Sequence, residues 1–97
     1  MVVIVPEAKR IANLEKHNID LAEFESSFSW DRYLMLPARP SRTGRVREMY
    51  LGFMHARLVA AVVSPLGAQA LAVISVPPAA EKERAAYDQF TRLEAGR

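Results

Sequence analysis

The sequence of 97 residues contains no cysteine and no apolar run long enough to cross a membrane. Without cysteine the chain forms neither a disulfide nor a thiolate metal site, and nothing ties it to an oxidising compartment. We therefore expect it in the cytoplasm. The apolar stretch at residues 2–5 is stopped by Pro6 and has no basic segment before it. It predicts a first strand, not a signal peptide or a membrane span.

Short catalytic signatures are missing as well. The chain has no Gly-rich phosphate loop and no G-x-S-x-G motif, and its two histidines belong to no close cluster of His, Asp and Glu. These absences argue against a metalloenzyme and against a triad hydrolase, and we expect no metal and no cofactor. Proton transfer and phosphate chemistry remain.

Composition predicts one folded domain over residues 1–97. Apolar residues make up 51% of the chain and charged residues 25%, which is typical of a globular protein with a modest core. The net charge is only +2, yet residues 31–57 hold six arginines against two acidic residues. Arginine clusters suit phosphate recognition because the planar guanidinium donates two parallel hydrogen bonds. A solvated basic loop would explain the pattern equally well.

The first third of the chain predicts two helices. Pro6 is suited to the first position of a helix, and Asn18 is suited to a left-handed cap, so residues 6–17 form the first helix. A capping-box pattern at residues 20–23 starts a second helix at Leu21. Its expected core face consists of Leu21, Phe24 and Phe28.

The remaining two thirds predict a sheet and a last helix. Strands are expected at residues 32–36, from Val46 to Phe53, at 57–64 and at 68–76, with a loop at 38–44 and a helix at 79–93. The fold class is therefore α+β: an N-terminal strand and two helices, an antiparallel sheet of three to four strands, and a C-terminal helix. Trp30 and Tyr33 are expected in the core or a subunit interface, and His55 in an exposed turn between two strands.

Three polar side chains share one face of the first helix. Lys9, Asn13 and His17 are spaced by four residues, so they lie above one another on the helix surface. Further along, Gly44 and Arg47 precede a strand, and a closing set consists of Gly52, Ile74, Ser75, Ala79, Glu83 and Tyr87. In this order the residues resemble the BrnT family of toxin ribonucleases, whose segments read K-x-x-x-N-L-x-K-H-G-I, G-E-x-R, I-S-x-R-x-A and E-x-x-x-Y.

The resemblance extends from Glu7 to Tyr87 and implies a RelE-like fold. It also implies a ribonuclease toxin of a type II toxin-antitoxin system, which inhibits translation and is neutralised by a BrnA-like antitoxin. The antitoxin of such a pair binds operator DNA, so this chain would contact DNA only through that partner. No membrane partner is expected, and both a homodimer and a hetero-oligomer with the antitoxin stay open.

RNA cleavage without a metal needs a base for the 2′-hydroxyl, an acid for the leaving 5′-oxygen and cations for the transition state. We expect Lys9, His17 and Arg47 to supply these, with His17 as the acid or base. Arg42, Arg45 and Arg57 are expected to bind RNA. Two structural alternatives stay open: His17 could stabilise the helix through its dipole, and Arg47 could form a salt bridge at the rim of the core.

The sequence departs from the family pattern in its last strand. The family's R-I-I-S-x-R has Ala72 and Pro77 at its two arginine positions here, and Arg45 replaces the acidic residue after Gly44. These changes favour an alternative function. A catalytically degenerate BrnT-like chain would act as a partner-binding module in transcriptional regulation by its antitoxin.

Overall fold

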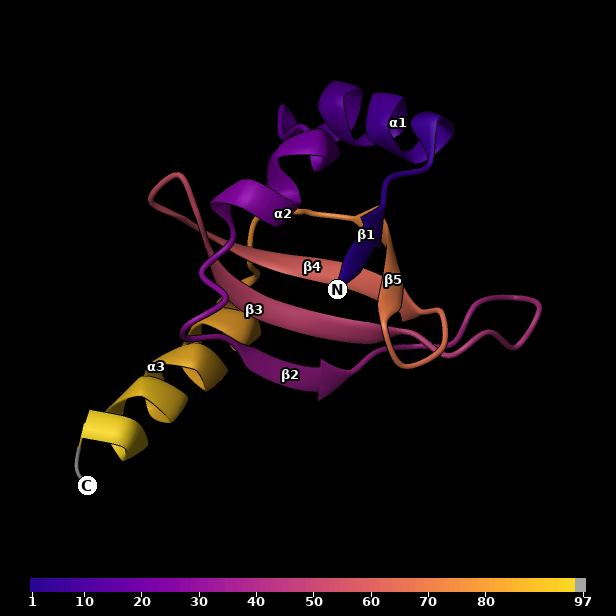
Figure 1. Cartoon of the computed structure of the whole chain (residues 1–97). Coiled ribbons are helices and arrows are strands. Elements are labelled where there is room, and N and C mark those ends of the chain that lie inside the picture. The colour runs from indigo at the N-terminus through magenta and orange to yellow at the C-terminus, as the bar shows by residue number, and fades with distance from the viewer. Residues whose placement is uncertain (96–97) are drawn as a thin grey trace.

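A single five-stranded sheet runs through the computed structural model, which describes residues 1–95 (Figure 1). In chain order the elements are β1 (Val2–Ile4), α1 (Glu7–His17), the 3₁₀ turn η1 (Leu21–Glu23), α2 (Phe24–Ser27), β2 (Leu34–Pro37), β3 (Glu48–Met54), β4 (Arg57–Pro65), β5 (Ala70–Ser75) and α3 (Glu81–Ala95). This order confirms the α+β class. Residues 96 and 97 of the predicted domain lie outside the described residues.

The strand order is β1-β5-β4-β3-β2. Strands β2 to β5 form the predicted antiparallel sheet, and β1 extends it by pairing parallel to β5. The predicted element boundaries shift by about two residues: β2 begins at Leu34, β5 at Ala70 and α3 at Glu81. Such shifts are expected because terminal turns are not fixed by periodicity alone.

The sheet separates two hydrophobic clusters. Side chains alternate along β3, so Tyr50 and Met54 join the larger cluster with η1 and α2, whereas Leu51 joins the smaller one with α3. The predicted core face of the second helix is confirmed, since Leu21, Phe24 and Phe28 are all buried. That helix begins at Leu21 as expected, although its first turn is 3₁₀.

An aromatic cluster fills the space under α2. It consists of Phe24, Phe28, Trp30, Tyr33 and Tyr50. Ring centroids in it lie as close as 4.8 Å, and Trp30 and Tyr33 pack against the larger core cluster, as predicted. A Cβ at Gly52 would stand 2.7 Å from the Phe28 ring, so only glycine fits on β3 at this point.

Candidate functional site

Asn13 fixes α1 to the end of the sheet. Its side chain is buried, and its amide donates to the carbonyl oxygens of Ile19 at 2.9 Å and Val76 at 3.2 Å. Its Oδ1 accepts the Val76 N–H at 2.9 Å. The expectation that all three polar residues of this helix face point outward is therefore wrong for Asn13. Its amide satisfies buried backbone groups that would otherwise lack partners.

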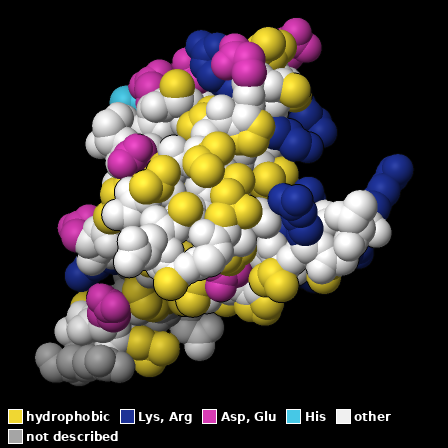
Figure 2. Space-filling model, turned by 45° about the vertical axis from the view of Figure 1, so that its right-hand side comes forward, with side chains coloured by type: hydrophobic (Ala, Val, Ile, Leu, Met, Phe, Trp, Pro, Cys, Tyr) yellow, Lys and Arg dark blue, Asp and Glu magenta, His cyan; other side chains and the backbone are white. Residues whose placement is uncertain are grey.

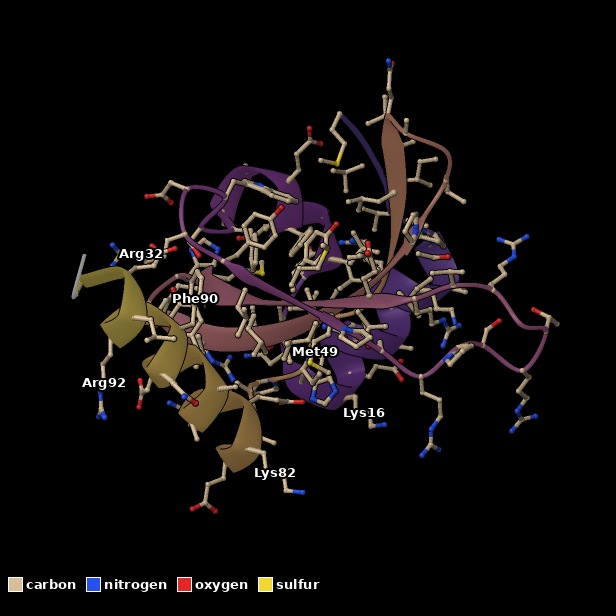
Figure 3. All side chains as sticks on the ribbon, turned by 90° about the horizontal axis from the view of Figure 1, so that it is seen from below. Lys16, Arg32, Met49, Lys82, Phe90 and Arg92 are labelled. Atoms are coloured by element: carbon tan, nitrogen blue, oxygen red, sulfur yellow. The ribbon has the colours of Figure 1, made fainter. Side chains whose placement is uncertain are left out.

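All three residues of that face line one cleft. Lys9 and His17 line an open cleft of about 440 Å³ between α1 and the end of β5, together with Lys16. Its opposite wall contains Ile74, Ser75 and Pro77. Among residues 1–95 no ion pair or side-chain hydrogen bond is formed by Lys9, Lys16 or His17. These groups are therefore free to bind an anion. Figure 3 shows Lys16 extending away from α1.

The two departures in the last strand occupy different environments. Pro77 is in the wall of this cleft, so the family arginine missing at that position removes a cation from the cleft itself. Ala72 is buried within the sheet, where it is paired with Ile4 on β1 and Ser64 on β4.

Arg47 lies just before β3 and is half-buried. Its carbonyl oxygen accepts a hydrogen bond from Ala38 N–H at 3.3 Å, which fixes the backbone there. No salt bridge to Arg47 occurs within the described part of the chain, so the structural alternative for this residue gains no support. Arg47 is not among the residues that line the Lys9–His17 cleft.

Arg42 and Arg45 are exposed on the loop between β2 and β3. The Ser41 carbonyl accepts the Gly44 N–H at 2.9 Å, and the Ser41 hydroxyl accepts the Arg45 N–H at 2.9 Å. The loop projects beyond the sheet (Figure 1), and Figure 2 shows Lys or Arg side chains on this projecting segment. Both guanidinium groups are thus presented to solvent at one end of β3.

Arg57 is at the opposite end of β3, where it pairs with Met54 across the hairpin. A strand of seven residues separates the two ends by about 20 Å at roughly 3.3 Å per residue. The three arginines predicted to bind RNA therefore form two groups. The strand predicted from Val46 to Phe53 lies between the two groups and accounts for their separation.

Arg57 lines a second cleft, of about 230 Å³, together with Asn18, Asp20, Glu23 and His55. We call it the hairpin cleft. His55 occupies an exposed turn between β3 and β4, as predicted, but its partner was missed: Nε2 lies 2.6 Å from Glu23 Oε1. Since 32 positions separate the two residues, no local pattern connects them.

Asp20, which lines the hairpin cleft, forms an ion pair with Arg10 through two hydrogen bonds. Arg10 Nε donates to Asp20 Oδ1 at 2.9 Å, and Nη2 donates to Oδ2 at 3.2 Å. These hydrogen bonds, and then the bond from Ala22 N–H, lower the pKa of the Asp20 carboxyl. The Asp20 carboxylate therefore stays charged, and the Arg10 guanidinium balances its charge.

Residues 1–95 contain no group of three or more His, Cys, Asp or Glu side chains placed to hold a metal ion. Within the same span, no helix has the length and apolar character needed to cross a membrane.

A family model described as the ribonuclease toxin BrnT of type II toxin-antitoxin systems matches residues 6–83. The fold is similar to the 1.1 Å crystal structure of the ribonuclease toxin BrnT of Brucella abortus, with a TM-score of 0.66 and 30% sequence identity. That alignment covers 84% of this chain and 99% of the Brucella chain. No match was found among curated protein sequences.

Proposed function

Because the chain belongs to the BrnT family, the ribonuclease toxins of type II toxin-antitoxin systems, we propose that it cleaves RNA without a metal ion and so inhibits translation. The family match at residues 6–83 includes both α1 and the arginine-bearing loop. Its RNA substrate places its action in the cytoplasm, and the whole chain acts as one domain.

The observation that carries this proposal is that Lys9 and His17 line the same open cleft as Lys16. None of the three side chains forms an ion pair among the described residues. An imidazole can accept or donate a proton near neutral pH, and an ammonium group stabilises the negative charge that develops on phosphorus oxygens. Arg47 lies outside the residues that line this cleft, is half-buried and forms no ion pair among the described residues, so its guanidinium is available to an RNA phosphate beyond the cleft. Arg42 and Arg45 guide the RNA backbone from the projecting loop.

The reaction needs no protein nucleophile. A base removes the 2′-hydroxyl proton, the 2′-oxygen attacks phosphorus, and the bond to the 5′-oxygen breaks as that oxygen gains a proton. We assign proton transfer to His17 and charge stabilisation to Lys9 and Arg47. Lysine and arginine charges then do what a metal ion does in other nucleases.

Pro77 in the cleft wall favours a second candidate function. A chain that lacks a cation there could keep its fold and partner surface with little catalysis. It would then bind a BrnA-like antitoxin, as a homodimer or a hetero-oligomer, and affect transcription only through the DNA-binding part of that partner.

The two functions are separated by RNA cleavage in EDTA with the purified chain and folded His17→Ala, Lys9→Ala and Arg47→Ala variants. Arg92→Ala is a matched control, because Arg92 is an exposed cation on α3 (Figure 3). We expect the parent and control to cleave, and His17→Ala to be slower by about a hundredfold. Equal background cleavage by all five proteins would contradict the proposed ribonuclease activity and favour the partner-binding function.

A further inference from the structure

Residues with unusual backbone angles gather at the hairpin cleft. The non-glycine residues with positive φ among those described are Asn18 at 57°, His55 at 48° and Ala56 at 64°. Asn18 caps α1, but His55 and Ala56 form the two-residue turn between β3 and β4. Such a turn favours Asn-Gly, because both residues must be left-handed. A His-Ala pair there costs conformational free energy, and costs of this kind concentrate at functional sites.

The strained turn brings His55 to Glu23 on η1. Their 2.6 Å contact joins His55 Nε2 to the carboxylate, so the neutral imidazole donates from Nε2 and leaves Nδ1 as an acceptor. The side chains are 61% and 52% exposed, so a ligand can reach this pair. A carboxylate that fixes the tautomer of a histidine is the arrangement used to orient a general base.

Arg57 supplies a cation in the same cleft. It follows the turn directly, is exposed, and forms no ion pair within residues 1–95. The other carboxylate of the cleft, Asp20, is occupied by Arg10. Met54 and Ile19 complete the walls with apolar surface. The hairpin cleft thus combines an oriented base with a cation that is free to bind a phosphate.

The end of α1 borders both clefts, because His17 lines one and its neighbour Asn18 lines the other. Figure 1 shows the β3–β4 hairpin and the end of α1 on the same side of the sheet. We propose that the hairpin cleft is a second RNA-cleaving site, in which His55 is the general base, Glu23 orients it, and Arg57 binds the scissile phosphate. The inference rests on the proposed function for its substrate.

The chemistry at this site balances without a cofactor. His55 Nδ1 takes the 2′-hydroxyl proton, and the freed electron pair forms the bond from the 2′-oxygen to phosphorus. The bond between phosphorus and the 5′-oxygen breaks, and its electron pair stays on that oxygen, which takes a proton from water. The imidazolium gives its proton to the hydroxide so formed. The products are a 2′,3′-cyclic phosphate and a 5′-hydroxyl end.

Cleavage of single-stranded RNA in EDTA under single-turnover conditions tests this site. In the His17→Ala background, where the hairpin cleft is the remaining site, we expect His55→Asn to lower the residual rate by about a hundredfold, the usual scale of a lost general base. Glu23→Ala in the same background should lower the residual rate, and Glu23→Gln should restore part of it, because the amide oxygen still accepts the Nε2–H of His55. Complete loss of cleavage in His17→Ala, or a residual rate in that background that no hairpin substitution changes, would overturn the inference and keep the proposed function. A parent that does not cleave would overturn both.

A matched pair of variants separates catalysis from folding. Ala56→Gly relieves the strain at one turn position and keeps His55, so it should melt at a higher temperature and still cleave RNA. The double variant His55→Asn, Ala56→Gly has the favoured Asn-Gly turn, so it should be at least as stable but inactive at this site. In the His17→Ala background, equal cleavage rates for the single and double variants would show that His55 has only a structural role.

Discussion

At the scale of single residues, Asn13 is the buried polar side chain of α1. Three hydrogen bonds connect it to the backbone at Ile19 and Val76. Truncation leaves buried donors and acceptors unpaired, so we expect Asn13→Ala to lower the free energy of unfolding by about 2–3 kcal/mol. Urea denaturation measures this change. The exposed neighbour Glu15 provides the control, and equal stabilities for Asn13→Ala and Glu15→Ala would contradict the role of the amide.

Asp20 gives the fold a dependence on acid. Because hydrogen bonds from Arg10 lower its pKa in the folded chain, the native state keeps this carboxylate charged to lower pH than the unfolded state. The stabilisation is therefore complete above the unfolded pKa and is lost as pH falls through the folded pKa. We expect the parent to lose more stability than Asp20→Asn between about pH 5 and pH 2. Melting temperatures measured across this range test the expectation, with Glu15→Gln as the control. Equal changes in melting temperature for the parent, Asp20→Asn and Glu15→Gln would contradict it.

Residue roles were predictable from the sequence only where a local rule applied. Asn18 follows from its cap position, with φ of 57° and an N–H bonded to Leu14. The burial of Asn13 depends on Val76, 63 positions later, and the His55–Glu23 contact depends on how the hairpin meets η1. Long-range pairings of this kind have no signature in periodicity, so one polar residue was misplaced and one pair was missed.

At the scale of elements, α3 is anchored to the sheet by Tyr87. This residue is buried, its ring packs edge-on to Phe53 at 5.7 Å, and its hydroxyl donates to the Arg32 carbonyl at 3.2 Å. We expect Tyr87→Ala to lower the free energy of unfolding by about 3–5 kcal/mol, and Tyr87→Phe by about 1 kcal/mol. Hydrogen exchange localises the effect. Unchanged protection of the α3 amides in a folded Tyr87→Ala variant would show that other contacts hold the helix.

Most elements were predictable because their ends carry strong local signals. Pro6 and Asn18 bracket α1, and alternation along β3 separates Tyr50 from Leu51 as the two clusters require. The parallel pairing of β1 with β5 was not predicted, because it joins the two most distant strands in the chain. The separation of Arg57 from Arg42 and Arg45 follows from β3, which lies between the segments that carry them, and RNA binding by Arg57 stays a prediction.

At the scale of the whole molecule, the loop between β2 and β3 places two exposed arginines at one end of the sheet. Arg42 and Arg45 project from one end of the sheet, and the net charge of +2 is small. If both contact RNA phosphates, replacing them by glutamine should reduce the slope of log K against log salt by about 1.4, since each contact with a single strand contributes about 0.7.

This slope is measured by fluorescence anisotropy with a 2′-O-methyl oligonucleotide, which binds without being cleaved. The matched control replaces Arg92 on α3, where we expect no change in slope (Figure 3). An unchanged slope for the Arg42→Gln, Arg45→Gln double variant would contradict the guiding role of the loop.

We propose that this BrnT-family chain cleaves RNA by proton transfer and cationic side chains. Mapping the ends of RNA incubated with the purified chain in EDTA tests it most directly. We expect cleavage in EDTA with 2′,3′-cyclic phosphate and 5′-hydroxyl ends. Added Mg²⁺ should leave the cleavage rate unchanged. Intact RNA in EDTA, or cleavage only with Mg²⁺ and with 3′-hydroxyl ends, would contradict the claim.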